Sequence, residues 1–96
     1  AIPLFPEVHR DLSLLLDTSV TYEQIEQLAF ETEKHLLKKV SIFDIYQGKG
    51  IPDGKKSYAV SFTIQSDTKT LVDKEIDAIM NKLIRVYSQK LNAELR

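Results

Sequence analysis

The sequence contains no cysteine, so neither a disulfide framework nor a thiolate metal site is available to it. It also lacks any uninterrupted apolar run near the roughly 20 residues that a membrane-spanning helix needs. Neither sign of charge dominates, because 13 lysines and arginines face 14 aspartates and glutamates and leave a net charge of -1. A domain that binds nucleic acid through bulk charge is usually strongly basic, so any contact with RNA has to be made by a local surface.

What is present is the composition of a small folded domain. The chain has 96 residues, of which 43% are hydrophobic and 28% are charged, and these proportions exclude an intrinsically disordered segment. It begins Ala1-Ile2-Pro3, with no initiator methionine and no signal or transit pattern. We therefore expect a single domain over residues 1–96 that is a piece of a longer polypeptide.

The first part of the chain predicts a strand followed by a helix. Leucines alternate with other residues over 10–17 (RDLSLLLD), which is typical of a strand with one buried face. Thr21 and Gln24 have the spacing of a capping box. A helix is expected after Thr21, because apolar residues recur at helical spacing as far as Leu36.

The second part predicts a hairpin, another helix and a short last strand. The runs 40–46 and 57–65 are rich in β-branched and aromatic residues, and the glycine-rich segment between them predicts a long hairpin loop. A broad apolar stripe predicts a helix over 72–91. Asn92 is expected to end this helix and to leave a short strand at 93–96.

The predicted order of elements is β-α-β-β-α-β. Because each helix has one apolar stripe, both helices are expected to cover the same face of a four-stranded antiparallel sheet. This arrangement is the ferredoxin-like split β-α-β sandwich of the α+β class. The function is then to be sought on the sheet face that the helices leave open.

Strand alternation divides the sheet residues between these two faces. The helix-covered face is expected to hold the alternate apolar residues of the first and third strands, together with Phe43 and Ile45 of the second. The open face is expected to hold Ser13, Leu15, Ile42, Asp44, Tyr46, Ser57, Ala59, Ser61 and Thr63. A small, polar surface with an aromatic at one end suits nucleic-acid bases, which stack on flat rings and bond to hydroxyls.

Charge is unevenly distributed along the chain. Residues 17–36 hold five acidic residues and one lysine, a local charge of -4, whereas residues 37–58 hold five lysines and two aspartates, a local charge of +3. Lys49, Lys55 and Lys56 around the hairpin are therefore candidates for phosphate contacts. Lysines in a hairpin loop are more often simply solvated, and Tyr46 taken alone is better explained by packing on that loop than by stacking on a base.

A set of motifs occurs in order along the chain: Phe5-Pro6, Arg10-Asp11-Leu12, Phe43 to Gly48, Gly50 to Ser57, Thr70-Leu71 and Leu95-Arg96. From Phe5 to Arg96 the chain resembles the ferredoxin-fold anticodon-binding domain at the C-terminus of bacterial-type phenylalanyl-tRNA synthetase β subunits. The spaced segment D-x-Y-x-G-x-x-I-P-x-G-K-K-S is the most specific part of this resemblance.

The resemblance implies a non-catalytic RNA-binding domain of a larger, cytoplasmic ligase. In that family the intact (αβ)2 enzyme uses ATP and Mg2+ to attach phenylalanine to tRNA-Phe, and the catalytic site lies in the α subunit. The resemblance implies no catalytic residue, metal or cofactor in this domain itself, and no membrane contact. Its partners would be the tRNA-Phe anticodon and, in the intact enzyme, the α subunit.

Carried over by position, the anticodon-contacting residues implied by the resemblance are Ser13, Tyr46, Ser57 and Arg96. Tyr46 would stack on the first anticodon base. Ser13 is small enough for a base to lie close to the sheet, and Ser57 offers a hydroxyl. Arg96 would bond a base or a phosphate through its planar guanidinium.

Two other functions are open on the same fold. One is a small-molecule-sensing or protein-interaction module, which would bind its ligand at a helix edge or a dimer edge. The other is an enzyme of the acylphosphatase type, which requires an anion-binding loop near the first strand, a catalytic arginine and an asparagine on a later strand. This second alternative is the weaker, because Arg10 leads directly into a strand and the first asparagine is Asn81.

Overall fold

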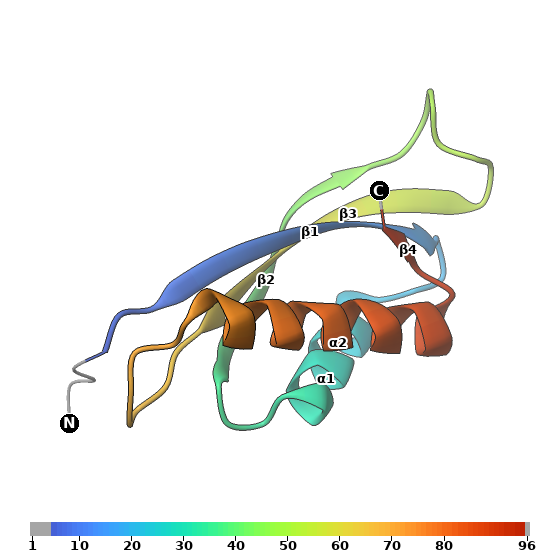
Figure 1. The fold of residues 1–96 in the computed structure, drawn as a ribbon. Coiled ribbons are helices and arrows are strands. Elements are labelled where there is room, and N and C mark those ends of the chain that lie inside the picture. Colours follow the sequence, from blue (N-terminus) through green and yellow to red (C-terminus); the bar gives the residue numbers. More distant parts are fainter. Residues whose placement is uncertain (1–4, 96) are drawn as a thin grey trace.

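The computed structural model describes residues 5–95, which form an antiparallel sheet with two helices packed on one of its faces (Figure 1). In chain order the elements are β1 (Val8–Asp17), α1 (Tyr22–Thr32), β2 (Leu37–Tyr46), β3 (Lys55–Ile64), α2 (Asp73–Leu91) and β4 (Glu94–Leu95). The predicted β-α-β-β-α-β order and the ferredoxin-like α+β arrangement are confirmed.

The four strands lie in the order β2-β3-β1-β4. β3 pairs with β1 along the full length of both strands and with β2 on its other side. β4 is a short edge strand that pairs with β1 at Leu14 and Leu15. Since all pairings are antiparallel and opposite residues in a ladder point to the same face, this register determines which residues share a surface.

The core lies between the helices and the sheet face that they cover (Figure 1). On α2, buried residues at helical spacing include Ile76, Leu83 and Tyr87, and the Tyr87 ring lies 6.4 Å from the Phe62 ring, centroid to centroid. The sheet contributes the residues of β1 and β3 that alternation assigns to this face, each at most 8% exposed: Leu12, Leu14, Leu16, Tyr58, Val60, Phe62 and Ile64. For these two strands the predicted division between faces is confirmed.

α1 is shorter than the apolar spacing predicts. It begins after the predicted Thr21 capping box, but it ends at Thr32, so Leu36 is not part of the helix. β2 correspondingly begins at Leu37 rather than at Val40. Leu37 is buried and pairs with the end of β3, and this strand pairing is favoured over extending the helix by another turn.

A β-bulge in the middle of β2 changes which of its residues face the helices. Ile42 lies opposite Val60, but the next paired residue is Asp44, opposite Ala59, so Phe43 is an inserted residue. Ile42 therefore lies on the covered face, where it packs against the core, and its predicted place on the open face is wrong. Phe43, predicted to be covered, is 60% exposed. Both predictions assumed an unbroken alternation, which does not hold across an inserted residue.

Beyond the bulge, the end of β2 regains the expected alternation. Asp44 and Tyr46 fall on the open face as predicted, while Ile45 lies opposite Tyr58 on the covered side. Ile45 is nevertheless 55% exposed. The reason is its position, because the hairpin end of β2 extends beyond the helices (Figure 1).

The fully buried Tyr87 side chain links the two helices. Its hydroxyl donates to the Ile25 carbonyl at a distance of 2.8 Å. Tyr87→Phe is expected to lower the free energy of unfolding by about 1–2 kcal/mol, because the carbonyl loses a partner while the packing is kept. Urea unfolding measures this loss. Ser88→Ala, on the exposed side of the same helix, is the control, and a loss no larger than the control's would contradict the prediction.

Tyr87 also predicts how stability changes in alkali. Burial raises the pKa of its phenol well above the ordinary value of 10.0. Above pH 10 the Tyr87 phenol therefore loses its proton in the unfolded chain but keeps it in the folded chain. The contribution of this phenol to the free energy of unfolding is thus complete below pH 10 and falls as the pH rises further. Tyr87→Phe should flatten the decline of unfolding free energy above pH 10, and an unchanged slope would contradict the assignment.

Candidate nucleic-acid interface

Within residues 5–95 no helix covers the sheet face opposite α1 and α2, and side chains on this face form rows that run across the paired strands. Side chains opposite one another in an antiparallel pair have Cβ atoms about 4.5–5.5 Å apart, so neighbouring rows form one continuous surface. Two adjacent rows lie at the hairpin end of this face. Read from β1 across β3 to β2, they are Leu15-Ser57-Tyr46 and Ser13-Ala59-Asp44.

Three of the four predicted site residues meet in these two rows. Tyr46 and Ser57 are direct cross-strand neighbours. Ser13 occupies the diagonal position to Ser57, about 7–8 Å away, and is exposed. Arg96 lies outside the described residues. The register thus brings Ser13, Tyr46 and Ser57 together, and their role in binding stays a prediction.

Tyr46 is tethered to the hairpin loop through its hydroxyl. The hydroxyl donates to the Lys49 carbonyl at 2.7 Å, and the side chain remains 42% exposed. The chain turns directly after Tyr46 at Gly48, whose φ of +132° favours glycine. Packing on the loop and stacking on a base are therefore compatible, because the loop holds the hydroxyl and leaves part of the side chain open.

Two of the three hairpin lysines are engaged within the domain. Lys55 lies opposite Asp17, and its ammonium is 2.8 Å from that carboxylate. The Lys56 ammonium lies 4.7 Å from the centroid of the Tyr58 ring. Lys49, in the exposed loop, is the hairpin lysine that best fits the predicted phosphate contact.

The open face carries carboxylates that the predicted site did not include. Asp44 lies beside Ala59 in the second row, and Asp11 follows beside Ser61 in the next row along β1. Both are exposed. Strand alternation placed Asp44 on this face, but only the register shows how near it lies to Ser13 and Ser57. The acidic residues of α1 belong to the helix layer, which the sheet separates from this surface (Figure 1).

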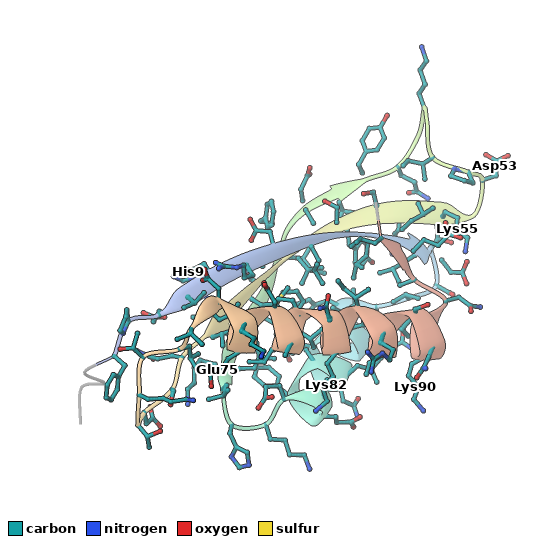
Figure 2. All side chains as sticks on the ribbon, viewed as in Figure 1. His9, Asp53, Lys55, Glu75, Lys82 and Lys90 are labelled. Atoms are coloured by element: carbon teal, nitrogen blue, oxygen red, sulfur yellow. The ribbon has the colours of Figure 1, made fainter. Side chains whose placement is uncertain are left out.

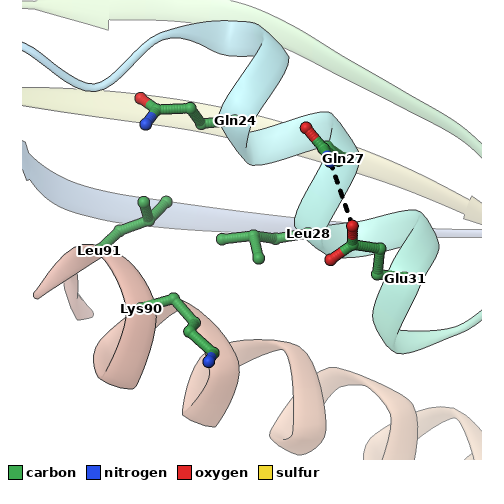
Figure 3. A pocket seen from close by; sticks show the side chains of 6 residues that line it. All are labelled: Gln24, Gln27, Leu28, Glu31, Lys90 and Leu91. Atoms are coloured by element: carbon green, nitrogen blue, oxygen red, sulfur yellow. Dashed lines mark hydrogen bonds between the residues drawn. The ribbon is translucent and has the colours of Figure 1, made fainter.

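Two hollows elsewhere on the domain bear on the alternative functions. One of about 230 Å³ lies between α1 and the end of α2 and is lined by Gln24, Gln27, Leu28, Glu31, Lys90 and Leu91 (Figure 3). Within it Gln27 donates to Glu31 at 3.1 Å. Another of about 410 Å³ lies beside β2 and is lined by Tyr22, Ser41, Ile42 and Ile45. Small-molecule sites usually hold about 300–1,000 Å³ with convergent polar groups, so the first hollow is small and the second lacks a charged residue.

Neither a metal centre nor a membrane span is found in residues 5–95. In that range no three His, Cys, Asp or Glu side chains are grouped so that they would hold a metal ion. Neither of the two helices is long and apolar enough to cross a membrane. Arg10, the anion-binding candidate for an acylphosphatase-type enzyme, donates to the His9 carbonyl at 2.9 Å and lies 4.0 Å from the Asp73 carboxylate.

Removing the Tyr46 hydroxyl tests its part in ordering the loop. Tyr46→Phe is expected to speed hydrogen exchange of the Ile51 amide, which donates to the Gly48 carbonyl at 3.0 Å inside the same turn. The free energy of unfolding should fall by no more than about 1 kcal/mol, since the hydroxyl is near the surface. NMR-detected exchange measures the effect. In the control Tyr22→Phe, which removes a hydroxyl bonded to the Val40 carbonyl, the Ile51 exchange rate should not change.

The sequence matches the model of a known family over almost its whole length. Residues 3–96 match the model described as "Ferredoxin-fold anticodon binding domain". This model matches nearly the same stretch as the resemblance noted from the motifs, which runs from Phe5 to Arg96.

Curated relatives agree with this match. The phenylalanine–tRNA ligase beta subunit of Bacteroides thetaiotaomicron is 58% identical over 95 residues, and that of Porphyromonas gingivalis is 57% identical over 95 residues. The corresponding subunit of Clostridium acetobutylicum is 40% identical over 96 residues. These alignments cover 99% to 100% of this chain and 12% of each relative. The chain thus spans about 12% of the length of the curated relatives that it matches.

Proposed function

The chain belongs to the ferredoxin-fold anticodon-binding domain family, and on that basis we propose that its open sheet face binds the anticodon of tRNA-Phe. The observation that carries this proposal is the register, which groups Ser13, Tyr46 and Ser57 on one uncovered surface. The relatives named as phenylalanine–tRNA ligase beta subunits indicate which tRNA is bound.

Stacking on Tyr46 supplies the main part of the proposed affinity. An aromatic ring on which a base stacks contributes about 1–3 kcal/mol per base. The Lys49 carbonyl restrains the ring through its hydroxyl, so little side-chain entropy is lost on binding. Stacking accepts any base, and discrimination between bases has to come from neighbouring polar groups.

Those polar groups lie in the same two rows. The Ser57 hydroxyl donates and accepts hydrogen bonds, and the small Ser13 lets a base approach the sheet. The Asp44 carboxylate accepts hydrogen bonds from base amino groups and repels phosphates, so it favours an RNA that presents its bases to the sheet. For Arg96 we propose a guanidinium contact to a base or a phosphate.

The same proposal extends to the protein of which this domain is a part. We assign the chain to the β subunit of a cytoplasmic phenylalanine–tRNA ligase, an (αβ)2 assembly in which the α subunit carries the catalytic site. In this proposal ATP and Mg2+ are bound elsewhere in that enzyme, where the α subunit carries out the reaction. Within it this domain binds tRNA and takes no part in the chemical step.

Tyr46→Ala tests the stacking contact directly. Its affinity for a tRNA-Phe anticodon stem-loop is expected to fall about 5- to 150-fold, the equivalent of one stacked base. An NMR titration of the isotopically labelled 96-residue chain measures the affinity and locates the shifts, which are expected on Ser13, Tyr46 and Ser57. Circular dichroism checks that the variant remains folded.

Tyr22→Ala is the matched control, because Tyr22 is an exposed tyrosine of the helix layer. It should leave the affinity unchanged. Unchanged affinity in Tyr46→Ala would remove Tyr46 from the site. Shifts confined to lysines and abolished by moderate salt would reduce the interaction to phosphate attraction and overturn the proposed base recognition.

A further inference from the structure

The end of the open face farthest from the hairpin carries a row of different composition. His9 of β1, Thr63 of β3 and Lys39 of β2 lie opposite one another in the register, and we call them the far row. His9 lies at the other end of the sheet from Asp53 and Lys55 of the hairpin (Figure 2). The far row holds an imidazole, a hydroxyl and an ammonium on a face that no helix covers.

The histidine of the far row is held by the threonine beside it. His9 Nδ1 lies 3.3 Å from Thr63 Oγ1, a hydrogen-bond distance. Thr63 is only 7% exposed, whereas Ser57, Ala59 and Ser61 on the same face of β3 are half-buried. Although Thr63 is nearly buried, His9 itself remains exposed. The imidazole is therefore oriented by a neighbour and still accessible from the open side.

Lys39 differs from its neighbour Lys38 in how its charge is used. A register shift at the start of β2 sets Lys39 opposite Thr63, on the open face. The Lys38 ammonium bonds the His35 carbonyl at 3.0 Å and lies 3.6 Å from the Asp67 carboxylate. Within residues 5–95 no carboxylate lies within 4.0 Å of the Lys39 ammonium, which is exposed. Among the described residues, Lys39 thus brings to the far row a positive charge that is not used in an ion pair.

Distance separates the far row from the surface around Tyr46. Ser57 and Thr63 are on the same strand, and at about 3.3 Å per residue their positions are about 20 Å apart. A stacked strand of nucleic acid rises about 3.4 Å per nucleotide, so about six stacked nucleotides span this gap, or fewer if the strand is extended. One nucleotide bound at Tyr46 does not reach the far row.

We propose that the far row is a second nucleotide subsite for the same RNA strand, in which a base stacks on His9 and its phosphate contacts Lys39. Imidazoles are among the rings on which RNA bases stack, and an ammonium is a natural phosphate contact. Asp11, beside His9 on β1, repels phosphate and accepts from base amino groups. The phosphate therefore lies toward β2 and the base toward β1. This inference rests on the proposed function.

Two RNA probes of different length test the subsite in the 96-residue chain. One is the tRNA-Phe anticodon stem-loop and the other is the anticodon trinucleotide, which is too short to contact both places. His9→Ala should weaken stem-loop binding at least about fivefold through lost stacking. Lys39→Ala should weaken it about two- to fivefold. Neither change should affect the affinity for the trinucleotide, whereas Tyr46→Ala should weaken the binding of both probes.

Two further measurements separate stacking and phosphate contact from general effects. His9→Phe keeps a ring and should recover most of the stem-loop affinity that His9→Ala loses. Lys39→Ala should lower the slope of log affinity against log salt by about 0.7, as expected for one lost phosphate contact to a single strand. Lys82→Ala, which removes an exposed lysine from α2 in the helix layer, is the matched charge control and should change neither quantity (Figure 2).

The outcomes distinguish failure of this inference from failure of the proposed function. Native stem-loop affinity in His9→Ala and Lys39→Ala, with weakened binding in Tyr46→Ala, would overturn the second subsite alone. Equal effects of Lys39→Ala and Lys82→Ala would also overturn it, since total charge would then explain the loss. If Tyr46→Ala binds both probes as the native chain does, the proposed function fails at Tyr46, whatever the far-row variants do.

Discussion

The one-sided burial of β3 is the constraint on which the rest of the domain depends. β3 is paired on both edges, and its residues Tyr58, Val60, Phe62 and Ile64 are at most 3% exposed beneath the helices. A strand that buries one row of side chains must present its other row to the opposite face. The spacing and direction of the open-face residues of β3 are therefore set by core packing.

A surface of this kind does not depend on the overall charge of the protein. The chain carries a net charge of -1, and Lys55 and Lys56 are used inside the domain. In the proposed function, stacking and short-range hydrogen bonds, which act at contact distance, supply the affinity that bulk charge does not. In the proposed function, such a domain selects an RNA that a larger protein already holds nearby, and the chain spans 12% of the relatives that it matches.

Much of this arrangement was predictable from the sequence because alternation and helix caps are local signals. The covered residues of β1 and β3, the Thr21 cap and the order of elements are all confirmed. The errors fall where local and distant preferences compete. Leu36 has helical spacing, yet the pairing of Leu37 with β3 ends the helix earlier, and the insertion of Phe43 has no signature in the pattern of apolar residues. The pairing of Lys55 with Asp17 depends on register, which a single strand does not reveal.

The bulge at Phe43 also separates two tasks within one strand. Val40 and Tyr46 are an even number of positions apart, so an unbroken strand would turn both to the same side. Val40 is instead 4% exposed in the core, while Tyr46 lies on the open face. The inserted residue shifts the phase of the strand, so that its beginning packs in the core and its end lies on the open face. Mutations on the hairpin side of the bulge can therefore accumulate during evolution without repacking the core, whereas straightening β2 with Phe43 kept in the alternation would turn Tyr46 toward the helices.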